Sequence, residues 1–160
     1  MSDPDGTPTA IDARLLGGLA LIDRGDFYEA HELLEEVWAG EVGAPRHVLQ
    51  ALIQVAVALH HRCNGNLGGA RTLLVRAQEH LIAVGAAEVV GVDAAAFSAC
   101  CARLLEEVDR AARVVADGSA PPPALDPSLR PRFDALRARI RAERSRRGLV
   151  PEPPIEPPAA

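Results

Sequence analysis

The sequence predicts an all-α protein, a compact bundle of about five helices built from two helical hairpins. Hydrophobic residues make up 48% of the 160-residue chain, yet aromatic residues make up only 3%. A core with so few rings must be filled mainly by Ala, Leu and Val, which favours closely packed helices. Apolar residues also recur at helical spacing, and Gly or Pro separates one periodic run from the next. The length fits one domain.

Each expected helix has a start or a stop signal. Asp12 follows Thr9 at the spacing of a capping box, and Gly25 ends the first helical run. Asp26 directly precedes the second run and is a natural N-cap residue. Gly65 ends the third run. The helices of the bundle are expected at residues 9–24, 27–39, 45–62, 67–84 and 93–116.

The C-terminal part differs in composition from the bundle. Residues 117–128 are rich in Pro, Gly and Ser, which is typical of a linker. Residues 129–160 contain an Arg-rich helix, expected over 130–147, and a Pro-rich tail. We therefore expect a disordered N-terminus at 1–8, a helical bundle domain at 9–116, and a basic appendage that folds back on the acidic body but is not needed for folding.

Composition excludes several classes of function. The formal net charge of −5 argues against a nucleic-acid partner, and no apolar run approaches the length of a membrane span. The N-terminus has neither the basic nor the apolar region of a signal peptide. Cys63, Cys100 and Cys101 show no metal-ligand spacing and are expected to be small buried side chains, which indicates a reducing compartment. We expect a cytoplasmic protein.

The chain repeats itself at a period of 40 residues. The segment from Gly25 to Ala30 aligns without gaps on the segment from Gly65 to Ala70. Each copy is a helix, a tight Gly turn and a second helix whose small Ala permits close packing. The pattern resembles tetratricopeptide-like hairpins, although their usual period is about 34. Two copies are too few for an open solenoid, so a closed bundle is expected, unless the match is a chance recurrence of turn residues.

Polar residues gather on one side of the third helix, which is otherwise apolar. They fall within an arc of about 80° on a helical wheel, and comprise Arg46, Gln50, Gln54 and His61. Buried polar groups without partners are costly, so this stripe must face something polar. His31 and Glu35 on the second helix are the obvious candidates. We expect these side chains to converge.

The other distinctive side chains have structural interpretations. Trp38, the single Trp, is expected to fill the core. His60 is expected to point toward the apolar side as a core histidine. His47 and His80 are expected to be surface residues.

The motifs on the second and third helices also resemble a known family. The pattern consists of the helix from Phe27 to Trp38, the run from Leu49 to Ala58, His61, and the turn from Gly65 to Ala70. It is similar to the bacterial and archaeal family called "domain of unknown function 309", and the similarity covers about residues 11–85. The resemblance implies a small all-helical bundle, and it implies a metal-dependent hydrolase because the family has been labelled so.

The residues suggest how such a hydrolase would be built. His31 and Glu35 have the i, i+4 spacing that lets two ligands meet one ion, and His61 would complete a set suited to zinc or manganese. Glu32 or Glu35 would activate water. Trp38, Arg46, Gln50 and Gln54 would bind the substrate. The His-Glu-x-x-His signature of zinc proteases is absent.

Two functions therefore stay open from the sequence. The first is the metal-dependent hydrolase acting on a small molecule. The second is a non-catalytic interaction module, in which the same polar residues form a structural network and the hairpins bind a peptide or a second copy of the chain.

Overall fold

The computed structural model of the protein describes residues 13–85, 88–89, 92–116, 118, 124–129 and 133–149. These residues are mostly helical, which confirms the all-α prediction. The expected N-terminal segment and the Pro-rich tail lie outside the described residues, and the domain boundaries stay a prediction. The elements are α2 (Ala13–Arg24), α3 (Phe27–Trp38), α4 (Gly43–Cys63), α5 (Leu67–Val84), β1 (Glu88–Val89), β2 (Val92–Asp93), α6 (Ala94–Ala116), the 3-10 turn η1 (Pro127–Leu129) and α7 (Asp134–Arg146).

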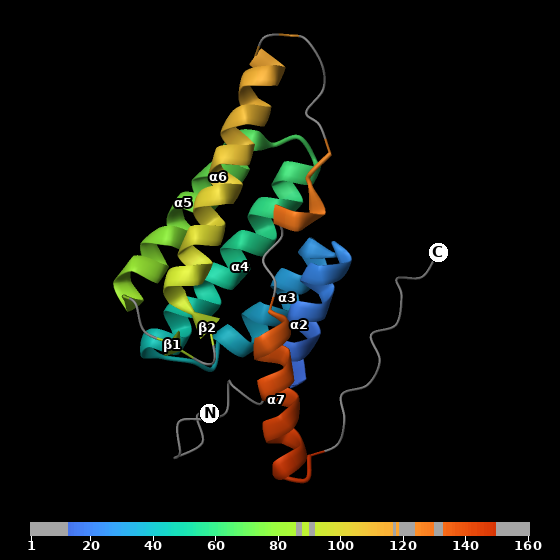
Figure 1. The fold of residues 1–160 in the computed structure, drawn as a ribbon, viewed down its shortest axis with the longest axis vertical. Coiled ribbons are helices and arrows are strands. Elements are labelled where there is room, and N and C mark those ends of the chain that lie inside the picture. The colour runs from blue at the N-terminus through green and yellow to red at the C-terminus, as the bar shows by residue number, and fades with distance from the viewer. Residues whose placement is uncertain are drawn as a thin grey trace.

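Helix α4 lies at the centre of the bundle. The α2–α3 hairpin covers one side of it, and α5 backed by α6 covers the other (Figure 1). Its buried side chains are almost all apolar and occupy most of its circumference; they include Val48, Leu49, Leu52, Val55, Ala56 and Leu59. The apolar wheel of the third expected helix thus correctly predicts a buried central helix.

The two turns that the 40-residue repeat aligns have similar backbones. Gly25 and Gly65 have φ angles of +84° and +80°, a region that favours glycine. Each glycine N–H donates to the carbonyl three residues earlier, at 3.1 and 3.2 Å. The N–H groups of Asp26 and Asn66 donate to the carbonyl five residues earlier, at 2.9 and 2.8 Å. The two turns share one backbone geometry, a glycine helix cap that also occurs at Gly148 after α7, so the repeat itself stays a prediction.

Glycine also permits the close contact of α2 with α3. A Cβ atom added to Gly18 would lie 2.7 Å from two side-chain carbons of Leu34, which is fully buried. Any larger residue at this position would have to displace that leucine from the core. The first hairpin is therefore packed through a glycine in α2 as well as through Ala30 of α3, which is also fully buried.

A buried ion pair joins α4 to α6. The Nε atom of Arg62 donates to both carboxylate oxygens of Glu107, at 3.1 and 3.0 Å. The two residues are only 4% and 8% exposed. The sequence analysis did not identify this pair, because 45 residues separate its members and neither lies in a recognisable motif.

A two-residue ribbon interrupts the helices between α5 and α6. Val89 pairs with Val92 in antiparallel register, and Val92 is buried against the core. The sequence analysis predicted no strand here, because two residues per strand are too few for an alternating pattern to be visible.

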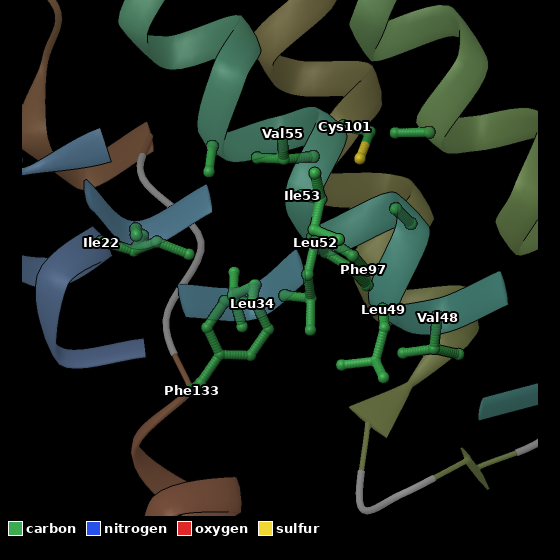
Figure 2. Packing of buried hydrophobic residues seen from close by; sticks show 14 of the residues in the cluster. Ile22, Leu34, Val48, Leu49, Leu52, Ile53, Val55, Phe97, Cys101 and Phe133 are labelled. Atoms are coloured by element: carbon green, nitrogen blue, oxygen red, sulfur yellow. The ribbon is translucent and has the colours of Figure 1, made fainter. Parts of the chain in front are cut away.

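The C-terminal helix contributes to the core, which corrects the expectation of a dispensable appendage. Phe133 and Ile140 are only 8% and 2% exposed and belong to the main hydrophobic cluster. Figure 2 shows Phe133 projecting into that cluster from the segment before α7. Its ring meets Phe97 of α6 edge to face, with centroids 5.6 Å apart. The sequence did not reveal this contribution, because Phe133 and Ile140 are two apolar residues seven positions apart in a segment that is otherwise rich in arginine.

The basic character of α7 anchors the same helix electrostatically. Arg137 is hydrogen-bonded and ion-paired to Asp23 of α2, and also to Asp134 on its own helix. The expected attraction between the basic C-terminal segment and the acidic body is thus present in the fold.

Phe133→Ala and Ile140→Ala should each lower the free energy of unfolding by about 2–4 kcal/mol, because each removes a buried apolar side chain. Urea unfolding followed by circular dichroism measures the change. Leu149→Ala, at an exposed position after α7, is the matched control and should change stability by less than about 0.5 kcal/mol. Equal, small effects of all three substitutions would restore the appendage interpretation.

Glu107→Leu should lower the free energy of unfolding by about 3–5 kcal/mol, because it takes the carboxylate away from a buried guanidinium. The double variant Arg62→Met/Glu107→Leu should recover most of this loss, since no buried charge is left. A double-mutant cycle in urea tests both statements. A double variant as unstable as Glu107→Leu would contradict this, and would show that the ion pair contributes more to stability than apolar side chains at the same two positions.

Candidate functional site

The polar residues predicted for a site differ in exposure. Glu32 and Glu35 point to solvent from α3. The others are half-buried, namely His31, Trp38, Arg46, Gln50, Gln54 and His61. The two carboxylates proposed to activate water are therefore more exposed than the other candidates.

His31 is turned back along its own helix. Its Nδ1 atom donates a hydrogen bond to the carbonyl oxygen of Tyr28, one turn earlier. Since a carbonyl only accepts, this bond places a proton on Nδ1 and leaves a lone pair on Nε2 in the neutral ring. The ring also packs edge to face on Tyr28, with centroids 4.6 Å apart.

Tyr28 connects the histidine of α3 to those of α4. Its ring lies 5.4 Å from the ring of His60, and His60 lies 6.0 Å from His61. We call Tyr28, His31, His60 and His61 the aromatic–imidazole cluster. The expectation that His60 points to the apolar side is wrong: it is half-buried and faces Tyr28, so it is His60 that meets the α3 side chains. A helical wheel gives relative directions only, and the rotation of α4 against α3 decides which of two adjacent residues faces across.

His61 is held by the turn that follows α4. The Oδ1 atom of Asn66 accepts from the Gly69 N–H at 3.0 Å and so caps α5. This bond orients the amide, so Nδ2 of Asn66 faces Nδ1 of His61 at 3.2 Å and donates to it. The proton of neutral His61 therefore sits on Nε2. His31 and His61 have opposite tautomers because their neighbours differ.

Arg46 and Trp38 form a cation–π contact at the C-terminal end of α3. The guanidinium carbon of Arg46 lies 3.7 Å from the centroid of the Trp38 ring. The same guanidinium donates to the carbonyls of Trp38 and Glu41, at 3.2 and 3.0 Å. It thereby adds a second donor to the Trp38 carbonyl, which already accepts from the Glu41 N–H at 3.0 Å, and it holds the segment that follows α3. Arg46 is thus engaged with the backbone at the end of α3.

Two buried polar atoms of the candidate residues have no hydrogen-bond partner in the described part of the chain. They are Nε1 of Trp38, a donor, and Oε1 of Gln54, an acceptor. The expected convergence of Gln54 with His31, Glu35 and His61 is therefore not borne out by any hydrogen bond of its buried oxygen. Within the polar stripe of α4, Arg46 contacts the end of α3, whereas His61 contacts Asn66 in the turn before α5.

The proposed metal ligands do not assemble. Among the described residues, no three His, Cys, Asp or Glu side chains are arranged to hold a metal ion. His31 is directed to the Tyr28 carbonyl, His61 to Asn66, and Glu35 to solvent. The i, i+4 spacing was compatible with a zinc or manganese site, but hydrogen bonds to the backbone and to the next turn direct the side chains elsewhere.

The sequence analysis missed a second pair of histidines. Nδ1 of His47 in α4 lies 3.0 Å from Nδ1 of His80 in α5. His47 is exposed as expected, whereas His80 is half-buried. Burial is the main cause that lowers the pKa of His80, the charge of His47 adds to it, and Glu79 opposes it. No sequence signal reveals the pair, because its members are 33 residues apart and outside the 40-residue repeat.

The family comparison covers the region that contains most of these residues. Residues 15–73 match the family model described as "Domain of unknown function (DUF309)". The chain contains a DUF309 domain. The match confirms the family indicated by the motifs of α3 and α4. No curated protein and no solved structure matches the chain.

The DUF309 match runs from α2 into α5 and so includes both hairpin turns and the aromatic–imidazole cluster. His80, Glu107 and all of α6 and α7 lie beyond it.

None of the described helices is long and apolar enough to cross a membrane.

The three thiols differ in environment. Cys63, at the end of α4 within the DUF309 match, is exposed, which corrects the expectation that it is buried. Cys100 and Cys101 of α6 are buried as expected. Burial raises the pKa of Cys100, and burial followed by the neighbouring Cys100 raises the pKa of Cys101 to about 12.

At neutral pH a thiol reagent should therefore modify one cysteine of the native protein, Cys63. The thiolate is the reactive form, and burial disfavours it at the other two positions. Mass spectrometry after a short iodoacetamide treatment measures the number of adducts, and Cys63→Ser should reduce it to none. Rapid labelling of Cys101 in the folded protein would show that α6 opens.

Proposed function

We propose that this protein is a non-catalytic interaction module that binds an arginine-rich peptide segment of a partner on the exposed face of α3. One observation carries the proposal: Tyr28 is 50% exposed, yet its ring is flanked by the imidazoles of His31 and His60 from two helices. An exposed aromatic side chain that is already ordered loses little conformational entropy on binding, and tyrosine is enriched among residues that dominate interfaces.

The ring face of Tyr28 suits a cationic partner. Aromatic rings attract a guanidinium through their quadrupole, and arginine also stacks on them. The Arg46–Trp38 contact uses the same chemistry within this chain. An arginine of a partner would have an equivalent surface at Tyr28.

Carboxylates next to Tyr28 support the same choice of partner. Glu29, Glu32 and Glu35 are exposed on α3, and none of them forms an ion pair within the described part of the chain. Glu36 lies 3.8 Å from Arg14 of α2. Arginine is favoured over lysine because its planar guanidinium pairs with a carboxylate through two hydrogen bonds while stacking on a ring.

The metal-dependent hydrolase implied by the family resemblance is the competing hypothesis. It requires His61 to release the Asn66 amide and turn with Glu35 toward an ion at Nε2 of His31, which keeps its bond to the Tyr28 carbonyl. The interaction module needs no such rearrangement, because the contacts of the aromatic–imidazole cluster are the ones that order Tyr28.

Fluorescence anisotropy of a labelled, arginine-rich peptide of about 15 residues tests the proposal. Tyr28→Ala should weaken binding about tenfold, because it removes the stacking surface without removing a buried group. Glu29→Gln/Glu32→Gln should weaken it about fivefold, and replacing arginine by lysine in the peptide should also weaken it.

The matched control is Glu79→Gln/Glu106→Gln, which makes the same change in net charge at exposed positions of α5 and α6. It should change the affinity by less than about twofold at 0.15 M salt, since distant exposed charges are screened. Equal losses in the two double variants would reduce the binding to general electrostatic attraction and contradict the proposal. Zinc- or manganese-dependent hydrolysis of p-nitrophenyl esters that His31→Ala abolishes would favour the hydrolase instead.

A further inference from the structure

The paired histidines of the second hairpin lie apart from the surface proposed for peptide binding. His47 is near the start of α4, whereas His60 is in its last turn. Thirteen residues of helix separate them, a distance of about 20 Å along the axis. Any role of His47 and His80 is therefore independent of Tyr28.

The two imidazoles face each other through the same ring atom. Their Nδ1 atoms are 3.0 Å apart, the ring centroids are 5.3 Å apart, and the ring planes are inclined by 40°. At this distance only one of the two nitrogens carries a proton, and the other offers its lone pair. Each ring projects from a long helix, and α4 and α5 pack closely against each other. Their backbones thus hold the two nitrogens close together.

The separation of the nitrogens is suited to a metal ion with square-planar or tetragonal geometry. Imidazole nitrogens bind such ions at about 2.0–2.1 Å, so two ligands at 90° are about 2.9 Å apart. Two ligands of a tetrahedral ion would be about 3.4 Å apart. The observed 3.0 Å is closer to the first value.

We propose that His47 and His80 form a two-histidine chelate for a tetragonal divalent ion, Cu²⁺ or Ni²⁺, with water in the remaining coordination positions. The ring that donates in the hydrogen bond transfers its proton from Nδ1 to Nε2 through solvent. Both rings stay neutral, and two water molecules leave the ion as the two nitrogens bind. Imidazole is a favourable ligand for both ions, and copper binds most tightly in the divalent series.

The movement required is confined to the two imidazole rings. In the hydrogen-bonded arrangement the two nitrogens point toward each other, whereas a chelate requires both lone pairs to point at an ion beside the line that joins them. Both rings therefore turn; His47 is exposed and His80 is half-buried, so neither rotation displaces a fully buried side chain.

Isothermal titration of the untagged full chain with Ni²⁺ tests the site. One ion should bind per chain, and His47→Gln and His80→Gln should each weaken binding at least tenfold. His61→Gln is the matched control, because it removes a histidine of the same helix outside the pair, and it should change the affinity by less than twofold. Bound Ni²⁺ should also raise the melting temperature of the unsubstituted chain.

Electron paramagnetic resonance of bound Cu²⁺ gives a second readout. It uses the Cys63→Ser variant, since an exposed thiol reduces Cu²⁺. An axial spectrum with coupling to two imidazole nitrogens is expected. Unchanged affinity in His47→Gln, which is exposed and should fold normally, would overturn the chelate, and so would a spectrum with one nitrogen. Peptide binding at Tyr28 should not depend on the metal, so failure of either proposal leaves the other standing.

Discussion

The rest of the structure depends on the burial of α4. Its apolar residues occupy so much of its circumference that helices must cover it on both sides; the α2–α3 hairpin covers one side, and α5 backed by α6 covers the other. A buried helix is stabilised when its polar side chains find partners, as several on α4 do. Arg46 does so at the end of α3, His61 with the cap of α5, and Arg62 with Glu107 of α6. Each of these contacts also joins α4 to one of its neighbours.

This constraint explains why candidate binding surfaces occur near the ends of α4. The middle of the helix is sealed by leucine, valine and alanine from the surrounding helices. Near its ends the cover is incomplete, and histidines there reach partners on another helix. His60 meets Tyr28 of α3 at one end, and His47 meets His80 of α5 at the other. The partner residue lies on α3 in one pair and on α5 in the other, so the two proposed ligands bind at separate places.

The charge distribution adds a second level of organisation. Asp23 of α2 pairs with Arg137 of the basic C-terminal helix, while Phe133 and Ile140 insert into the core. The glutamates on the outer face of α3 stay exposed. The arginine-rich segment of the chain thus illustrates, on α2, the kind of contact that we propose for a partner on α3.

The sequence by itself determined the helices, the two equivalent turns and the family, because these depend on local hydrogen bonds and on the spacing of apolar residues. Gly25 and Gly65 occupy the same backbone conformation for that reason. Only the tertiary structure decided which histidine faces Tyr28 and that the metal ligands do not meet. Side-chain direction depends on helix rotation and on competing acceptors such as the Tyr28 carbonyl, and neither follows from residue spacing.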